Sequence, residues 1–179
     1  GILWLGTYGG GLNRFNSQSE SFTRYRFDKN DANSLSADIV WAITEDKQGI
    51  LWIGTEKGLN RFDTSTEEFK HYLFDAENHN SISNNRIQAI VEDHDGTLWI
   101  GTANGLNRMN RQTGHFERFT ETEGLPNSVI YSIQEDNEGI LWMSTNVGLS
   151  RFDPNTGEFE NYDVLDGLQS NEFNTGASF

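Results

Sequence analysis

The sequence predicts an all-β protein built of repeated four-stranded antiparallel sheets. A motif of the form Gly-x-Leu-Trp followed by Gly-Leu-x-Arg occurs four times, with its tryptophans at positions 4, 52, 99 and 142. Successive copies are therefore 48, 47 and 43 residues apart, a period that is typical of repeat proteins. The segments between turn residues are short and rich in β-branched and aromatic residues, which favours strands over helices.

Each copy contains four such strands, and the second copy shows them most clearly. They are expected over residues 39–46 (IVWAITED), 50–55 (ILWIGT), 58–63 (GLNRFD) and 68–74 (EFKHYLF). No segment carries a helical pattern of useful length. We therefore expect no helix longer than one or two turns.

The connections between these strands have the composition of tight turns. The first is Asp-x-x-Gly, as from Asp46 to Gly49, in which Asp accepts backbone N–H bonds and Gly supplies a left-handed residue. The second is Thr-x-x-Gly, as from Thr55 to Gly58, and the third spans six residues, as in DPNTGE over 153–158. All three are hairpins, so each copy is predicted to be a four-stranded meander.

The second strand of each copy is apolar at odd and even positions alike, as in ILWIGT over 50–55. A strand on a half-exposed sheet alternates, so this strand must be covered on both faces. Sheets stacked face to face around a channel achieve this, and the sequence therefore predicts a β-propeller with four-stranded blades. The repeated Trp is expected to pack between blades, and Gly6, Gly54 and Gly101 leave room for the neighbouring blade, with Ser144 in the fourth copy.

The chain is predicted to form a single propeller segment of four repeats, over about 1–37, 38–84, 85–127 and 128–179. Sixteen strands are expected, including one candidate in NEFNTGASF at 171–179. The register is shifted, since the chain begins at a second strand and ends near a first strand. Either the two ends complete one blade, or the chain is an arc of a larger propeller, and the arc is favoured.

The composition excludes several classes of function. The chain has 13 basic and 27 acidic residues, a net charge of −14, which repels phosphate backbones and anionic lipid. Nucleic acid is thus not an expected partner. Cysteine is absent, which excludes disulfides, thiolate nucleophiles and thiolate metal sites. No cofactor is expected, and any link to a membrane would come through further segments of a parent protein.

The repeat resembles a known family. The pattern Glu-Asp-x-x-Gly-x-Leu-Trp-x-Gly-Thr-x-x-Gly-Leu-x-Arg-Phe, as over residues 45–62, and the preceding connectors NSLS at 33–36 and NSIS at 80–83 are similar to the two-component regulator propeller repeat. The resemblance implies the periplasmic, extracytoplasmic sensor of a bacterial membrane receptor with a histidine kinase or diguanylate cyclase output. It implies ligand sensing, in some members of glycans, without catalysis by the propeller.

The residues that recur in every copy are expected to serve the repeat. The acid pairs Glu45-Asp46, Glu92-Asp93 and Glu135-Asp136 have turn duties already, so a structural role is favoured over a metal or acid/base site. The recurrent arginines are expected to pair with these acids or to cover blade edges; they are Arg14, Arg61, Arg108 and Arg151. The four histidines fall in unrelated places, which disfavours a propeller lyase and a metal site.

Candidate binding residues are sought where the copies differ, because the repeat does not determine them. Trp41, Gln88 and Tyr131 occupy one place in the first strands, and Arg86 lies two residues before Gln88. Glu56 and Asn146 lie at variable places of the second hairpins. These hairpins and the inter-blade connectors are expected to open on one face, at the mouth of the channel.

Two functions follow from this pattern. Aromatic rings beside amide and guanidinium groups suit a small polar molecule or an oligosaccharide, so a ligand-sensing module is the leading hypothesis. An interaction scaffold, for which a homodimer is one arrangement, is the alternative, and Trp41 and Tyr131 could equally fill space between blades. An apolar patch on the rim would favour the scaffold.

Overall fold

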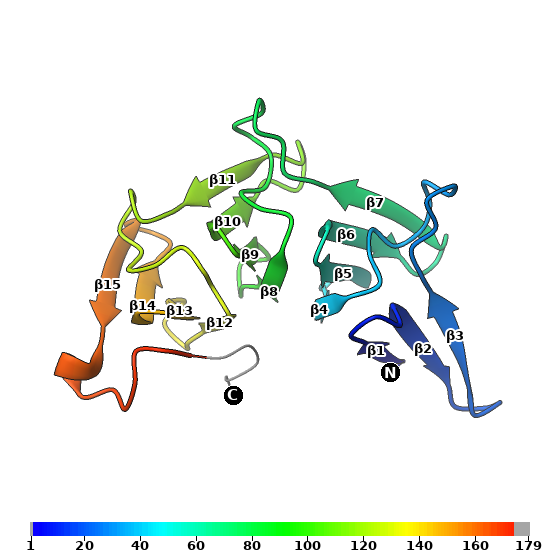
Figure 1. Cartoon of the computed structure of the whole chain (residues 1–179), viewed down its shortest axis with the longest axis horizontal. Coiled ribbons are helices and arrows are strands. Elements are labelled where there is room, and N and C mark those ends of the chain that lie inside the picture. The colour runs from blue at the N-terminus through cyan, green and yellow to red at the C-terminus, as the bar shows by residue number, and fades with distance from the viewer. Residues whose placement is uncertain (1, 174–179) are drawn as a thin grey trace.

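The computed structural model describes residues 2–173, and these form four antiparallel sheets arranged side by side in an open arc (Figure 1). We number the sheets as blades 1 to 4 along the chain. Blade 1 has three strands and the other blades have four each, every one paired in sequence order. The predicted all-β propeller architecture is confirmed.

The strand bounds follow the turn residues of the sequence. Blade 1 contains β1 (Leu3–Gly6), β2 (Leu12–Asn16) and β3 (Ser21–Tyr25); blade 2 contains β4 (Val40–Glu45), β5 (Ile50–Thr55), β6 (Gly58–Asp63) and β7 (Glu68–Tyr72). Blade 3 contains β8 (Ile87–Glu92), β9 (Leu98–Thr102), β10 (Gly105–Met109) and β11 (Phe116–Phe119); blade 4 contains β12 (Ser132–Glu135), β13 (Leu141–Thr145), β14 (Gly148–Asp153) and β15 (Glu158–Tyr162). The single helix among residues 2–173 is a 3-10 turn, Val164–Asp166. No helix in this range is long and apolar enough to cross a membrane.

The sixteenth strand expected at 171–179 is not seen where the structure can test it. Residues 171–173 are not in a strand, and residues 174–179 lie outside the described part of the chain.

The Asp-x-x-Gly hairpins form as the sequence predicts. Asp46 accepts hydrogen bonds at Oδ1 from the backbone N–H groups of Gln48 (3.0 Å) and Ile50 (2.9 Å). Gly49 then takes the left-handed conformation with φ of 78°, which a residue with a Cβ adopts only at a cost. In blades 3 and 4, Asp93 and Asp136 likewise accept the N–H groups of Thr97 and Ile140, and Gly96 and Gly139 are left-handed.

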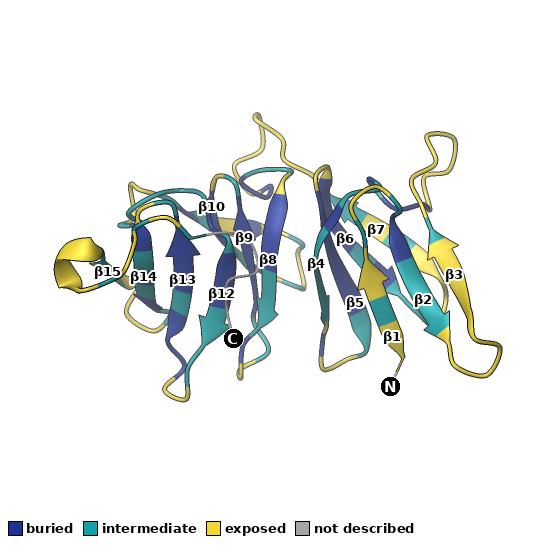
Figure 2. Cartoon of the chain, turned by 60° about the horizontal axis from the view of Figure 1, so that its bottom comes forward, coloured by how far each residue is buried: buried dark blue, intermediate teal, exposed yellow. Residues whose placement is uncertain are grey.

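The hydrophobic core lies between the blades rather than within them. Each of its three parts combines two residues of one blade, the repeated Trp and the Leu that follows the second-hairpin Gly, with the apolar second strand of the next blade. Between blades 3 and 4, for example, Trp99 and Leu106 meet Leu141, Met143 and Phe152. Trp52 and Trp99 are 2% and 1% exposed, as expected of residues packed between blades. In Figure 2 the second strands of blades 2 to 4 are largely buried, whereas β1 is largely exposed.

Glycine sets the distance between blades. A Cβ atom built on Gly54 would lie 2.7 Å from Ile87 Cγ2, and one built on Gly101 would lie 2.7 Å from Ile130 Cγ2. Both distances are far below van der Waals contact, so the blades could not approach this closely around a larger residue. The predicted spacing role of these glycines is confirmed.

Candidate functional site

Connectors and second hairpins lie on one face of the arc, which we call the mouth face. The backbone N–H groups of Gly9 and Gly11 donate to Asp38 O, at 3.1 and 2.9 Å. Equivalent bonds join Gly58 to Asn85 (2.7 Å) and Gly105 to Ser128 (2.6 Å). The expected common face of these two kinds of loop is confirmed. The first and third hairpins lie at the other ends of the strands, on the face that we call the opposite face.

A β-bulge near the start of the first strand presents the variable residues. The pairing of β4 with β5 shifts register between Val40 and Ala42, around Trp41. The pairing of β8 with β9 shifts in the same way around Gln88. In blade 4, Ser132 pairs with Ser144. The N–H of the preceding residue, Tyr131, also donates to Ser144 O, at 3.0 Å. Trp41, Gln88 and Tyr131 therefore occupy equivalent bulge positions on the inner strands of the arc.

Three of the mouth residues form a group that we call the aromatic cluster: Tyr8, Trp41 and Arg86. Tyr8 is 79% exposed and meets the Trp41 ring edge-on, with 5.7 Å between ring centroids. The Arg86 guanidinium lies 5.0 Å from the centre of the Trp41 ring, within the range of a cation–π interaction. Among residues 2–173, no carboxylate lies within ion-pair distance of Arg86, and Trp41 Nε1 has no hydrogen-bond partner.

The remaining predicted residues form no single group with this cluster. The Tyr131 hydroxyl donates to Asn146 Oδ1 at 2.9 Å, so these two residues lie together on blade 4. Glu56 is exposed on the second hairpin of blade 2. Gln88 is only 4% exposed, and its Nε2 donates to Ile130 O at 3.2 Å while its Oε1 is unpartnered among the described atoms. Gln88 is thus buried, whereas the other five predicted residues are partly or fully exposed.

On the opposite face, each turn Asp is bound to the Trp of its own blade. The indole Nε1 of Trp52 donates to the carboxylate of Asp46 (2.8 Å), that of Trp99 to Asp93 (2.7 Å) and that of Trp142 to Asp136 (2.8 Å). The Trp142 hydrogen bond lowers the pKa of Asp136. These acids therefore orient the packing tryptophans in addition to closing the turns, which supports their structural interpretation.

The turn Glu residues link neighbouring blades on the same face. Glu92 of blade 3 accepts from the Lys47 N–H of blade 2 at 2.8 Å, and Glu135 of blade 4 accepts from the His94 N–H of blade 3 at 2.9 Å. Lys47 Nζ also donates to the carbonyl oxygens of Asp93 (2.9 Å) and His94 (2.8 Å). The result is a belt of polar contacts that runs from blade 2 to blade 4.

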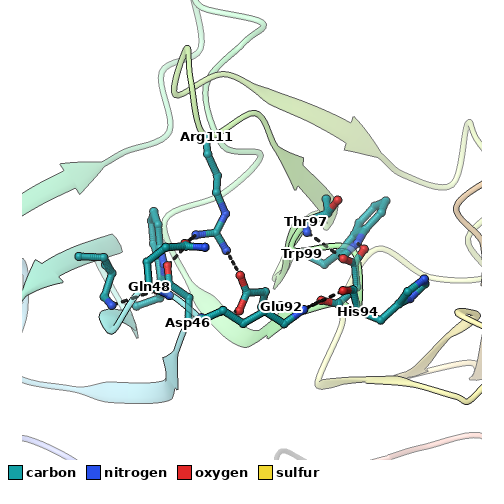
Figure 3. A network of polar contacts seen from close by, with 11 residues as sticks. Asp46, Gln48, Glu92, His94, Thr97, Trp99 and Arg111 are labelled. Carbon is teal, nitrogen blue, oxygen red and sulfur yellow. Dashed lines mark hydrogen bonds and ion pairs between the residues drawn. The ribbon is translucent and has the colours of Figure 1, made fainter.

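Arg111 closes this network from the third hairpin of blade 3 (Figure 3). Its guanidinium contacts Asp46 Oδ2 at 2.6 Å and Glu92 Oε1 at 2.7 Å, and it lies over the Trp52 ring. Burial acts to raise the pKa of Asp46, but the hydrogen bonds from Trp52, the Ile50 N–H and Arg111 outweigh it and lower that pKa. A buried carboxylate with this many donors stays ionised and fixed in place.

The histidines do not converge. His94 bonds to Glu135 through Nδ1, and this bond together with the charge of Asp95 raises the pKa of His94. His71 Nε2 lies 2.8 Å from Ser34 O on blade 2, and His79 and His115 are exposed on separate loops. Within residues 2–173, no group of three or more His, Asp or Glu residues is placed to hold a metal ion.

The recurrent arginines do not pair with the turn acids, which corrects one of the two roles expected for them. They pair with other acids instead, namely Arg14 with Glu67, Arg61 with Asp63, Arg108 with Glu117 and Arg151 with Glu160. Arg14 and Arg108 also lie over the rings of Trp4 and Trp99. In these two blades the guanidinium group therefore lies against the packing tryptophan, and the expected covering of blade edges by the arginine stems stays a prediction.

The sequence analysis missed three features of these sites: the Asp–Trp hydrogen bond and the roles of Tyr8 and Arg111. The Asp–Trp bond had a signal, since Trp follows Asp by six residues in three copies. Tyr8 and Arg111 had only a weak one, because each stands at a variable hairpin position far in sequence from the residues that it contacts.

A separate hollow of about 480 Å³ lies away from the mouth. It is lined by residues of β10, β11 and their hairpin, among them Arg108, His115 and Glu117. Arg108 donates to Glu117 through both Nε and Nη2, so the charged groups of this hollow already satisfy one another. The aromatic cluster remains the candidate site.

The repeats match a known sequence family. Three segments, residues 34–57, 81–104 and 124–147, match the sequence model of the family described as two component regulator propeller. None of the curated protein sequences matches the chain.

Solved structures show the same arrangement of blades. The extracellular domain of a proposed hybrid two component system from B. thetaiotaomicron superimposes with a TM-score of 0.77 at 30% identity, covering 90% of this chain and 23% of that one. A second such domain from the same organism has a TM-score of 0.53 at 24% identity, covering 96% of this chain and 28% of that one. Virginiamycin B lyase from Staphylococcus aureus has a TM-score of 0.68 at 18% identity, with coverages of 91% and 52%. The last two likenesses show the fold alone.

Proposed function

Because this chain is a β-propeller segment built from two component regulator propeller repeats, we propose that it is a ligand-sensing part of a bacterial signalling receptor. It works on the extracytoplasmic side, in the periplasm, and itself performs no catalysis. The ligand binds on the mouth face, and its occupancy is passed to a kinase or cyclase output elsewhere in the receptor.

The comparisons support the receptor context. The neighbour at 30% identity is the extracellular domain of a proposed hybrid two component system. This chain spans 23% of that neighbour, so it supplies one part of such an assembly. The likeness to virginiamycin B lyase extends to the fold, and the described histidines are not gathered as an acid/base site would require.

The aromatic cluster is the observation that carries the site. Tyr8 and Trp41 offer ring faces and edges at a variable position of the repeat, and the Arg86 guanidinium beside them has no ionic partner among the described residues. Trp41 Nε1 is a buried donor without a partner among residues 2–173, a state that usually persists only where water or a ligand completes it. Rings flanked by charged and amide donors suit a sugar or another polar organic molecule.

The other predicted residues extend this site along the inner wall. Tyr131 and Asn146 present a hydroxyl and an amide on blade 4, and Glu56 stands at the rim of blade 2. Gln88 lies on β8 of blade 3, and its Oε1 has no partner within the described part of the chain. We propose that the ligand contacts Gln88 through a water molecule or after a small movement of the neighbouring side chains.

Calorimetric titration of the chain with a panel of neutral and acidic oligosaccharides tests the proposal. For a ligand that binds, Trp41→Ala, Arg86→Ala and Tyr131→Ala should each weaken binding by about 1 to 3 kcal/mol, since each removes a stacking or polar contact. The matched control is Arg24→Ala, which removes an exposed arginine from the outer strand β3. A ligand whose affinity is unchanged in all three mouth variants would show that the site lies elsewhere.

Thermal melts of the same variants separate binding from packing. A side chain that only contacts ligand can be truncated with little change in melting temperature, whereas a side chain that fills space between blades cannot. Trp52→Ala should lower the melting temperature without a specific effect on affinity, because Trp52 is buried between blades 2 and 3.

A further inference from the structure

A histidine links blades 3 and 4 on the opposite face. His94 lies in the first hairpin of blade 3, and its backbone N–H donates to Glu135 Oε2 of blade 4 at 2.9 Å. Its ring Nδ1 bonds to Glu135 Oε1, so both oxygens of this carboxylate contact the same residue. The interface lies inside the chain, and the structure describes all four strands of both blades.

The His94 ring lies against blade 4 where that blade has no side chain. A Cβ atom built on Gly139 would lie 2.8 Å from His94 Cε1, so any larger residue at this position would displace the ring. The ring borders a hollow of about 440 Å³, which is further lined by Glu135, Asp136, Asn137, Glu138 and Gly139. In Figure 3 the ring points away from Arg111 and Glu92, toward blade 4.

Both nitrogens of the His94 ring face a carboxylate oxygen. Nδ1 bonds to Glu135 Oε1, and Nε2 lies 3.4 Å from Asp95 Oδ1. A neutral imidazole carries one N–H, so one of its nitrogens would present a lone pair to a carboxylate. The imidazolium donates from both nitrogens and places a positive charge between the two acids. This geometry therefore favours the protonated ring.

The other charged groups around the ring act in the same direction, with one exception. Further acids near it are Asp93 in its own hairpin and Asp136 and Glu138 on blade 4. Lys47 of blade 2 is the exception, since its Nζ donates to the His94 carbonyl oxygen at 2.8 Å. The hydrogen bond to Glu135, followed by the charge of Asp95, raises the pKa of His94 above its ordinary value.

The interface between blades 2 and 3 has a lysine at the same place. Lys47 has the hairpin position in blade 2 that His94 has in blade 3, and its N–H donates to Glu92 Oε2 at 2.8 Å. Its Nζ donates to two carbonyl oxygens of the next hairpin. A lysine side chain is ordinarily cationic throughout the range between about pH 5 and pH 8, whereas histidine changes its charge within that range. One interface thus carries a permanent charge and the next a titrating one.

We propose that His94 is a pH-dependent link between blades 3 and 4, stronger when its ring is protonated. Because its pKa is raised in the folded chain, the link contributes its full stability below the unfolded pKa of about 6.5. This contribution is lost as the pH rises through the raised folded pKa. Acidification from about pH 8 to pH 6 therefore strengthens this interface, and the neighbouring interface of Lys47 does not share the effect.

Nuclear magnetic resonance of the His94 ring measures its proton affinity directly. The midpoint of the Hε1 chemical-shift titration should lie above the ordinary histidine value of about 6.5. It should fall in Glu135→Gln, which keeps an oxygen to accept the His94 N–H but removes the negative charge. A midpoint that Glu135→Gln leaves unchanged overturns the proposal, because the link would then not depend on this pair.

Thermal melts of the 179-residue chain test whether the link stabilises the fold. His94→Asn introduces the residue that blade 4 has at this place, Asn137. At about pH 5.5 this variant should melt about 1 to 3 °C below the wild-type chain, the effect of one exposed charge pair. The difference should shrink toward about pH 8.5, and it should fall by about half or more in a Glu135→Gln background. His79→Asn is the control for the loss of an exposed histidine on another loop.

His94→Lys gives the interface between blades 3 and 4 the residue of the neighbouring interface. Relative to His94→Asn, this variant should be stabilised equally at about pH 5.5 and pH 8.5, whereas the wild-type chain is stabilised only at the lower pH. The proposal is overturned if the wild-type chain has the same advantage over His94→Asn at both pH values, has none at either, or gains it as the pH rises.

Discussion

At the scale of single residues, the packing tryptophans explain why the repeat keeps both Trp and Asp. The Trp99 ring fills the core between blades 3 and 4, and its Nε1 donates to Asp93. The indole is thus apolar on its faces and satisfied at its one polar atom, which removes the usual penalty for burying Trp. Asp93 in turn accepts the Thr97 N–H at 2.8 Å and closes the hairpin.

Removing a packing tryptophan should destabilise the chain according to its burial. Trp99→Ala should lower the free energy of unfolding by about 3 to 5 kcal/mol, since it creates a cavity and leaves Asp93 without a donor. Trp142→Ala should have a smaller effect because Trp142 is only partly buried. Urea denaturation of both variants measures the difference, and equal losses would contradict the assignment of the two environments.

Asp46 should make the stability depend on pH. Its pKa in the folded chain is lowered, so the ionised form stabilises the fold at pH values above the unfolded pKa of about 3.9. This contribution is lost as the pH falls through the lowered folded pKa, where both states become protonated. Urea denaturation at several pH values should show a deficit for Asp46→Asn near neutrality that shrinks in acid. The exposed Asp31→Asn is the control, and a deficit that grows in acid would reverse the predicted sign.

At the scale of the elements, each connector is tied to the following blade by a repeated polar group. Asn60 Oδ1 accepts the Ser36 N–H at 2.9 Å, and Ser36 Oγ lies 2.8 Å from Thr55 Oγ1. Asn107, Ser83 and Thr102 repeat this group in blade 3. In blade 4 the connector carries Pro126, which has no N–H to donate, and Ser150 stands where the other blades have Asn. In blades 2 and 3 the Asn accepts the N–H of the connector residue. Pro126 cannot donate this hydrogen bond, which explains why blade 4 needs no Asn at position 150.

Close approach of the blades should make Gly101 intolerant of any side chain. Gly101→Ala places a Cβ against Ile130 and should lower the free energy of unfolding by about 1 to 3 kcal/mol, through overpacking. Ser144→Gly at the same place in blade 4 is the matched comparison, because no following blade packs on it among the described residues. Its effect should be smaller, and chemical denaturation compares the two. A neutral Gly101→Ala variant would mean that the blades can separate without loss.

At the scale of the whole molecule, the arc behaves as a row of units in which each blade contacts its neighbours. The three core clusters join blades 1 with 2, 2 with 3 and 3 with 4. Stability in such a row is a sum of blade and interface contributions. Within residues 2–173, blades 2 and 3 have two interfaces each and blades 1 and 4 have one, so opening of this 179-residue chain should begin in blades 1 and 4.

Hydrogen exchange should therefore be faster in blade 1 than in the middle of the arc. Amides of β1 to β3 are expected to exchange before those of β5 and β9, because local opening of blade 1 breaks one interface only. Mass spectrometry of deuterated peptides measures this order. Uniform protection across the four blades would instead indicate a single cooperative unit.

The sequence by itself determined the strands, the hairpins and the stacking of blades. Asp46, Gly49 and Trp52 are close in the chain, and their spacing repeats, so local geometry and burial on both strand faces could be predicted from the pattern alone. The mouth face was also predictable, since the direction of each strand in a meander follows from the number of hairpins before it.

Only the tertiary structure decided which variable residues meet. It joined Tyr8 to Trp41 and Arg86, buried Gln88, and brought Arg111 to Asp46, 65 residues away in the chain. The physical reason is that hydrogen bonds within a hairpin depend on neighbouring residues, whereas these contacts depend on how far one blade is rotated and displaced relative to the next. That displacement is set by the packing of whole blade faces, with Gly against Val or Ile at each interface, and no single repeat contains it.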